Sequence, residues 1–155
     1  MTRKPLTVSL AALALILCAA APPAAAQSFD EEVRRMVDQV VEAWNGGDPG
    51  ALAEMFTEDA DLRDQDGLWL VGREDIHGYF EKWMAGSEGA KEVHVDRSRL
   101  VTEELAVVDV ISGIVPEGGT FWGEETERLA ITVQVARQPD GSWLFASWRQ
   151  CGSAR

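Results

Sequence analysis

The sequence predicts one α+β domain in which helices cover one face of a curved sheet. Three helical patterns come first and a run of strand patterns follows, an order typical of this class. Six Trp, five Phe and one Tyr supply ample aromatic surface for a core or a pocket. The chain beyond residue 26 has the length of a single domain.

The helical patterns have recognisable starts and stops. Ser28 and Glu31 match a capping box, so we expect the first helix to begin at Ser28 and to end in Asn-Gly-Gly at residues 45–47. Its apolar positions recur at helical spacing: Phe29, Val33, Met36, Val37, Val40, Val41 and Trp44. Asp48 and Pro49 open a second helix whose apolar face ends at Phe56. A third helix is predicted from residue 72 to residues 86–89.

The strand patterns occupy most of the rest of the chain. Short strands are predicted at residues 60–64 and 68–71, around an Asp66-Gly67 turn. Longer strands follow at residues 92–101, 105–115, 120–137 and 142–150. The third of these is long for one strand, and we expect Gly123 to form a bulge or bend in it.

Residues 1–26 have the pattern of a secretory signal. Arg3 and Lys4 precede an apolar run at residues 6–21, and an Ala-Ala-Ala site ends at residue 26. We therefore expect export to the periplasm or the extracellular space as a single domain, residues 27–155. A retained membrane anchor and a lipoprotein modified at Cys18 are the alternatives. The run is short and interrupted by proline, and Leu17 is bulky for a lipoprotein site, so cleavage is favoured.

Cleavage leaves a strongly acidic domain. The loss of Arg3 and Lys4 leaves 12 basic against 26 acidic residues, a net charge of −14. Such a charge disfavours binding to nucleic acid, and we expect no membrane association after cleavage. Cys151 becomes the only cysteine, so no disulfide can form within the chain. Without Cys-x-x-Cys, His-x-x-x-His or a glycine-rich phosphate loop, we expect neither metal nor cofactor.

Residues 43–60, AWNGGDPGALAEMFTEDA, resemble the opening of SnoaL-like and ketosteroid-isomerase-like domains. These domains belong to the nuclear-transport-factor-two-like superfamily. Gly-Arg-Glu-Asp-Ile at residues 72–76 and Asp-Gly-Ser-Trp at residues 140–143 extend the resemblance over about residues 30–150. It implies a cone-shaped curved antiparallel sheet wrapped round three N-terminal helices, an α+β barrel. It also implies an apolar pocket inside the cone and a homodimer.

The resemblance also suggests where a reaction would occur. Asp64 falls at the position of the general base of ketosteroid isomerases, where a carboxylate moves a proton between carbons of a ketone. The positions of their oxyanion donors hold Val40 and Val133, which cannot donate, so steroid isomerisation is not expected. Asp64 also suits a plain turn. His94, on a predicted strand, is a second candidate acid or base, or a half-buried structural residue.

The remaining candidates are residues that would line a pocket. Asp109 interrupts an apolar strand and faces either the pocket or an outer-face partner such as Arg99 or Arg128. Thr132 and Gln134 share one strand face and raise the same question. The aromatic candidates are Trp44, Phe56, Trp69, Tyr79, Phe80, Trp83 and Trp148. Core packing is their alternative role.

Three functions are compatible with this pattern. The favoured one is an aromatic-lined pocket that binds a small hydrophobic molecule without turnover. The second is a cofactor-independent isomerase, cyclase or dehydratase that uses Asp64 or His94 as proton carrier. The third is a dimeric interaction domain whose pocket is filled by its own side chains. Whether the protein is an enzyme stays open at this stage, because one fold hosts many activities.

Overall fold

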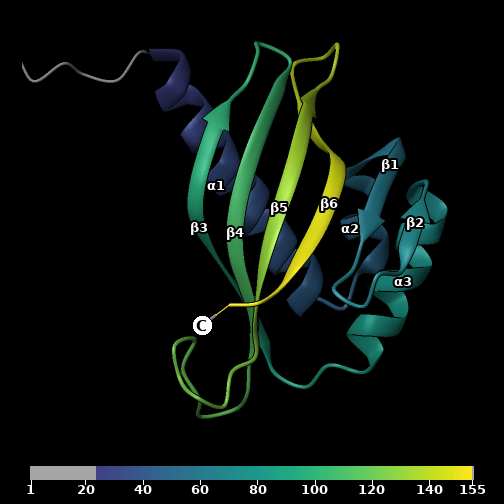
Figure 1. The fold of residues 1–155 in the computed structure, drawn as a ribbon, viewed down its shortest axis with the longest axis vertical. Helices are drawn as coiled ribbons and strands as arrows, with labels where there is room; N and C mark the ends of the chain where they lie inside the picture. The colour runs from purple at the N-terminus through teal and green to yellow at the C-terminus, as the bar shows by residue number, and fades with distance from the viewer. Residues whose placement is uncertain (1–23, 155) are drawn as a thin grey trace, which may run out of the picture.

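The computed structural model describes residues 24–154, which fold into helices and one curved sheet. The helices are α1 (Ala24–Asn45), α2 (Pro49–Glu54) and α3 (Arg73–Ala85). The strands are β1 (Phe56–Arg63), β2 (Trp69–Val71), β3 (Ala90–Leu100), β4 (Leu105–Val115), β5 (Arg128–Arg137) and β6 (Trp143–Ser153). Figure 1 shows the sheet curving round α1, with α2 and α3 beside β1 and β2. The predicted α+β class is confirmed.

The six strands form one sheet in the order β2-β1-β6-β5-β4-β3. Strands β3 to β6 form an antiparallel meander, and β1 and β2 form a hairpin. The expectation of a wholly antiparallel sheet is wrong at one junction, because β1 and β6 are parallel. The last strand of the meander, β6, runs in the same direction as β1, so these two strands pair in parallel.

Helix α1 forms the centre of the core. Its inward stripe consists of residues that are at most 6% exposed: Phe29, Val33, Met36, Val40 and Trp44. The stripe packs inside the sheet, and burial of each such side chain contributes about 1.5–3 kcal/mol. The helix begins at Ala24, upstream of Ser28. Ser28 is therefore not its N-cap, and the capping-box prediction is wrong.

Asp48 caps α2 as predicted, since its Oδ1 accepts a hydrogen bond from the Ala51 amide at 2.9 Å. The helix ends at Glu54, two residues before the end of its predicted apolar face. Phe56 already begins β1, where it pairs with Phe145 of β6. Apolar periodicity cannot separate the last turn of a short helix from the first residue of a buried strand.

The long strand predicted at residues 120–137 is wrong in its first half, because β5 begins at Arg128. Residues 120–127 form a compact loop instead. Gly123 N–H donates to the Thr120 carbonyl at 3.0 Å, and Arg128 Nη1 donates to the carbonyls of Phe121 and Gly123 at 2.8 and 2.9 Å. These local bonds satisfy backbone groups that a strand would have paired with a neighbour.

The N-terminal region bears on the predicted signal. Its apolar run, residues 6–21, lies outside the described residues. Within residues 24–154, no helix combines the length and the apolar character that crossing a bilayer requires. Cys151 lies in β6 as an exposed free thiol rather than at a frayed end.

Candidate functional site

A cavity of about 670 Å³ opens at one end of the curved sheet, between α3 and the ends of β3 to β6. Its apolar walls come from Trp83, Ile114, Pro116 and Leu129. Its uncharged polar groups include Tyr79, Ser112 and Gln150, and its amines are Lys82 and Lys91. Carboxylates also line it, from Asp64, Asp66, Glu88, Glu125 and Glu127. The cavity therefore combines an apolar interior with an acidic rim.

Lys91 is the most unusual group in this cavity. It lies on β3 and is only 3% exposed. Its Nζ lies 4.3 Å from the ring centre of Trp44 and 4.8 Å from that of Trp83. Within residues 24–154, no carboxylate lies close enough to form an ion pair with it. Burial lowers the pKa of Lys91 to about 7, so a large fraction of the side chain is a neutral amine near neutrality.

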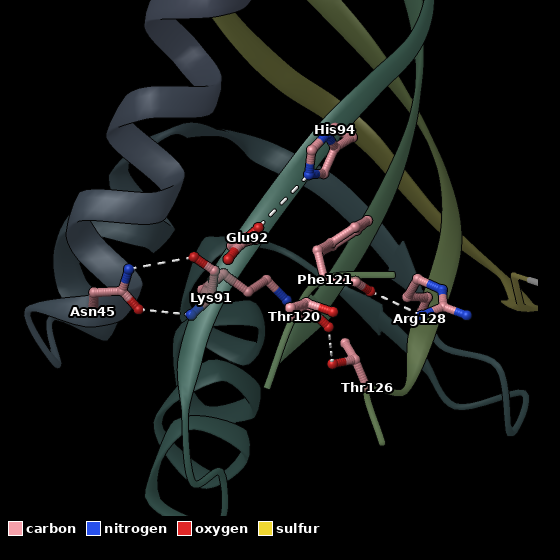
Figure 2. Close-up of polar contacts among 8 residues, drawn as sticks. All are labelled: Asn45, Lys91, Glu92, His94, Thr120, Phe121, Thr126 and Arg128. Carbon is pink, nitrogen blue, oxygen red and sulfur yellow. Dashed lines mark hydrogen bonds and ion pairs between the residues drawn. The ribbon is translucent and has the colours of Figure 1, made fainter. Parts of the chain in front are cut away.

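The end of α1 fixes the backbone of Lys91. Strand β3 is an edge strand, so one row of its backbone groups has no partner strand. Asn45 supplies the partner at this point: its Oδ1 accepts from the Lys91 N–H at 2.8 Å, and its Nδ2 donates to the Lys91 carbonyl at 3.3 Å. Figure 2 shows both bonds joining the end of the helix to the strand. The Asn-Gly-Gly stop of α1 therefore also positions Lys91.

Ser112 connects the cavity with the interior of the cone. It is 2% exposed, and its hydroxyl has no hydrogen-bond partner among the described residues. The same residue lines a smaller apolar space of about 30 Å³ between α1 and the sheet. Trp148, whose buried indole N–H is likewise unpartnered, lines that space too. Buried polar groups are normally hydrogen-bonded, so these two groups keep unused hydrogen-bonding capacity in the interior.

Tyr79 and Gln150 form the wall near the β1–β2 hairpin. Gln150 Nε2 donates to the Tyr79 hydroxyl oxygen at 3.2 Å. Burial raises the pKa of Tyr79, the Gln150 bond opposes this effect, and the nearby Asp64 and Asp66 add to it. Tyr79 is therefore a neutral phenol at physiological pH, able to donate a hydrogen bond into the cavity.

Asp64, the predicted proton carrier, does line this cavity, but it also shapes the hairpin. Its Oδ1 accepts from the backbone N–H groups of Asp66 at 3.0 Å and Leu68 at 2.8 Å. These bonds hold the β1–β2 turn, which is a common role of aspartate in turns. Among the described residues, the other carboxylate oxygen, Oδ2, accepts no hydrogen bond.

His94 lies outside the cavity. It shares the outer face of β3 with Glu92, whereas Lys91 and Val93 lie on the inner face. It is exposed, its Nε2 lies 3.7 Å from Glu92 Oε2, and its ring centre lies 4.1 Å from that of Phe121 (Figure 2). The 116–127 loop brings Phe121 onto this outer face, over Gly113. A Cβ on Gly113 would lie 3.1 Å from the Phe121 ring, so glycine permits the approach.

The aromatic candidates lie in different parts of the molecule. Tyr79 and Trp83 line the large cavity and Trp148 lines the small space, whereas Trp44 packs beneath Lys91. Phe56 and Phe80 are fully buried and pack against each other and against Trp148, so they form core rather than pocket wall. Trp69 is 61% exposed on β2.

Asp109 lies on the outer sheet face, because Val108 and Val110 on either side of it point inward. Its Oδ1 accepts a hydrogen bond from Thr132 Oγ1 at 2.6 Å on the neighbouring strand. Gln134 shares that face with Thr132 and is exposed. The register thus places Asp109, Thr132 and Gln134 away from the cavity, and the partner of Asp109 is Thr132 rather than Arg99 or Arg128.

Sequence reasoning did not single out Lys91, Ser112 or Gln150. One signal for Lys91 was present: it has the same alternation phase as Val93, whereas Glu92 and His94 have the opposite phase. Lysine is almost never fully buried unless it is paired, so a lysine in the inward phase of a strand is unusual. Ser112 and Gln150 carried no comparable signal, because serine and glutamine occur on either face.

The family model described as the SnoaL-like domain matches residues 37–144. The chain belongs to this family. No protein of curated function matches the sequence.

Solved structures similar to this SnoaL-like domain support the same fold. They include an NTF-2 like protein of unknown function from Shewanella oneidensis, with TM-score 0.65 and 17% identity, covering 78% of this chain and 97% of that one. A ketosteroid isomerase-like protein from Erwinia carotovora atroseptica has TM-score 0.64 and 12% identity, covering 79% and 95%. A proposed scytalone dehydratase from Novosphingobium aromaticivorans has TM-score 0.65 and 17% identity, covering 84% and 87%. At these identities the likeness is one of fold.

Proposed function

We propose that this SnoaL-like domain binds a small neutral molecule with an apolar body and one oxygen-bearing group. The observation that carries the proposal is the unpartnered hydroxyl of Ser112, buried where the large cavity meets the apolar space inside the cone. A ligand oxygen there would accept or donate the missing hydrogen bond, while an apolar body would contact Trp83, Ile114 and Leu129.

The charge of the cavity supports a neutral ligand. Exposed carboxylates of Asp66, Glu88, Glu125 and Glu127 line the cavity and repel anions. Lys82 and Lys91 offset them only in part, because they are two amines against five lining carboxylates and a large fraction of Lys91 is neutral near pH 7. The volume of about 670 Å³ lies in the range of pockets that hold small organic ligands.

Three probes with one carbon skeleton test the proposal: cinnamyl alcohol, cinnamaldehyde and the anion cinnamate. Titration calorimetry should show binding of the alcohol and weaker binding of cinnamate.

Leu129→Trp should fill the cavity and weaken alcohol binding at least about ten-fold, the equivalent of 1.4 kcal/mol. Gln134→Trp, on the exposed outer face of the same strand, is the matched control and should bind as the native chain does. Equal binding by both variants would place the ligand elsewhere.

A second candidate function is proton transfer next to a carbonyl group, because Asp64 and Tyr79 line the same cavity. Asp64 Oδ2 would accept the proton and the Tyr79 phenol would donate a hydrogen bond to the carbonyl oxygen. The test is exchange of the α-hydrogens of a bound aryl ketone for deuterium in D₂O, followed by NMR.

For that reaction, Asp64→Asn should abolish the protein-dependent exchange while keeping an oxygen that can accept the turn hydrogen bonds. Asp66→Asn serves as the control for the loss of one rim charge, and His94→Gln should have no effect, since His94 lies on the outer face. Exchange that survives Asp64→Asn would remove Asp64 from this role.

A further inference from the structure

Two separate features of β3 and β4 meet in the cavity: a buried lysine without a counter-charge and a buried hydroxyl without a partner. Lys91 lies opposite Ile114 in the antiparallel pair, and Val93 lies opposite Ser112. Lys91 and Ser112 are therefore diagonal neighbours on the inward face, within reach of each other for a side chain as long as lysine. The register brings the amine and the hydroxyl to one wall of the cavity.

We propose that Lys91 is a nucleophilic amine that forms an imine with an aldehyde or ketone bound in this cavity. The inference rests on the proposed binding function and assigns it a ligand class, carbonyl compounds, and a covalent step. Two tryptophan faces, a cavity wall and the absence of an acidic partner within the described residues define the site of the amine.

The surroundings of Lys91 favour the neutral, reactive form. The faces of Trp44 and Trp83 attract an ammonium ion only weakly. Burying such an ion without a compensating carboxylate costs more than this attraction returns. Burial is therefore the larger effect, in agreement with the lowered pKa of Lys91. Lysines desolvated in this way act as nucleophiles toward carbonyl carbons.

The cavity also holds groups for the proton transfers that imine formation needs. The amine lone pair attacks the carbonyl carbon, and the carbonyl oxygen takes a proton to give a carbinolamine. The nitrogen loses one proton, and the hydroxyl group is protonated and leaves as water as the C=N bond forms. The resulting iminium then loses its remaining N–H proton to give the neutral imine. The Tyr79 phenol and the Ser112 hydroxyl line the cavity and can donate and return these protons. The net change is one amine and one carbonyl group converted to an imine and water, with no oxidation.

The composition of the chain makes a direct test possible. Beyond residue 26 the only lysines are Lys82 and Lys91. Lys82 is exposed on α3 and lines the same cavity. It is therefore an internal control with better access to solvent and the same local concentration of ligand.

The full chain is incubated at pH 7 with cinnamaldehyde and sodium cyanoborohydride, which reduces an imine to a stable secondary amine. Peptide mass spectrometry then measures the adduct at Lys91, at Lys82 and at the terminal amine. About one ordinary lysine in 2,500 is neutral at pH 7, so Lys91 should be labelled at least about ten-fold faster than Lys82. Lys91→Met should remove the fast adduct.

The binding of cinnamyl alcohol separates this proposal from the one on which it rests. If the alcohol binds in the cavity and Lys91 is labelled no faster than Lys82, the imine is excluded and the binding function stands. If the alcohol does not bind and Lys91 is not labelled, both proposals fail for this ligand class. Fast labelling at Lys91 that the alcohol suppresses by competition supports both.

Discussion

Lys91 illustrates how a single side chain departs from the rules that govern the rest of the chain. Lysine is almost never fully buried without a carboxylate partner, yet Lys91 is 3% exposed between two tryptophans. Such a group lowers stability whenever it must carry a charge. The free energy of unfolding should therefore depend on the charge of Lys91, and so on pH.

The first prediction concerns this pH dependence of stability. The pKa of Lys91 is about 7 in the folded chain, against the ordinary value of 10.5 that holds in the unfolded chain. Between these values the unfolded state binds a proton that the folded state lacks, so the free energy of unfolding rises with pH through this window. Below pH 7 both states are protonated and the contribution is constant. The rise is on the order of a few kcal/mol.

Urea unfolding of the native chain and of Lys91→Met from pH 6 to 10 measures this effect. Other groups, such as Tyr79 and Lys82, titrate in both proteins and cancel in the comparison. The variant should be the more stable of the two near pH 7, and its advantage should shrink as the pH approaches 10. A difference that stays constant over this range would mean that Lys91 is charged throughout.

At the scale of elements, the contact between α1 and β3 determines where Lys91 lies. Helix α1 ends at Asn45 because Gly46 and Gly47 follow, and that same stop brings the Asn45 amide to the free edge of β3. The last residue of α1 thus takes the place of a neighbouring strand for the backbone of Lys91 on β3. The sequence predicted the stop but not this contact, because the bond joins residues that are 46 positions apart.

The second prediction tests that contact. Asn45→Ala removes both bonds to the Lys91 backbone and should lower stability by about 1 kcal/mol, because Asn45 is partly exposed. It should also accelerate hydrogen exchange at the Lys91 amide and slow the labelling of Lys91 by cinnamaldehyde. Asn45→Asp keeps the oxygen acceptor for the Lys91 N–H, so its effect on that amide should be smaller. Equal exchange rates in all three proteins would contradict the positioning role.

At the scale of the whole molecule, the fold was predictable and the site only in part. Caps, glycine stops and the periodicity of apolar residues are local signals, and they predicted the three helices and most strand boundaries. Residues 120–127 were predicted as a strand because their loop is held by bonds that leave no periodic pattern. The inward or outward direction of Asp109 and the burial of Lys91 depend on strand register and bulges, which only the assembled sheet determines.

The third prediction concerns export, which we propose from the pattern of residues 1–26. The predicted cleavage after Ala26 falls in the first turn of α1, where backbone N–H groups lack helical partners and the helix opens most easily. The first buried core residue of the described helix is Phe29, so cleavage removes no member of the apolar stripe.

The full chain, expressed in a bacterial host with its own N-terminus, should therefore be recovered outside the cytoplasm with Gln27 as its first residue. N-terminal sequencing and intact mass measure this directly, and Cys18→Ala should leave the product unchanged. Chains of residues 27–155 and 1–155 should unfold at the same temperature, since both contain the whole core. An intact Met1 or a lipid on Cys18 in the recovered protein would contradict the cleavage, whereas a less stable 27–155 chain would show that residues 1–26 contribute to the fold.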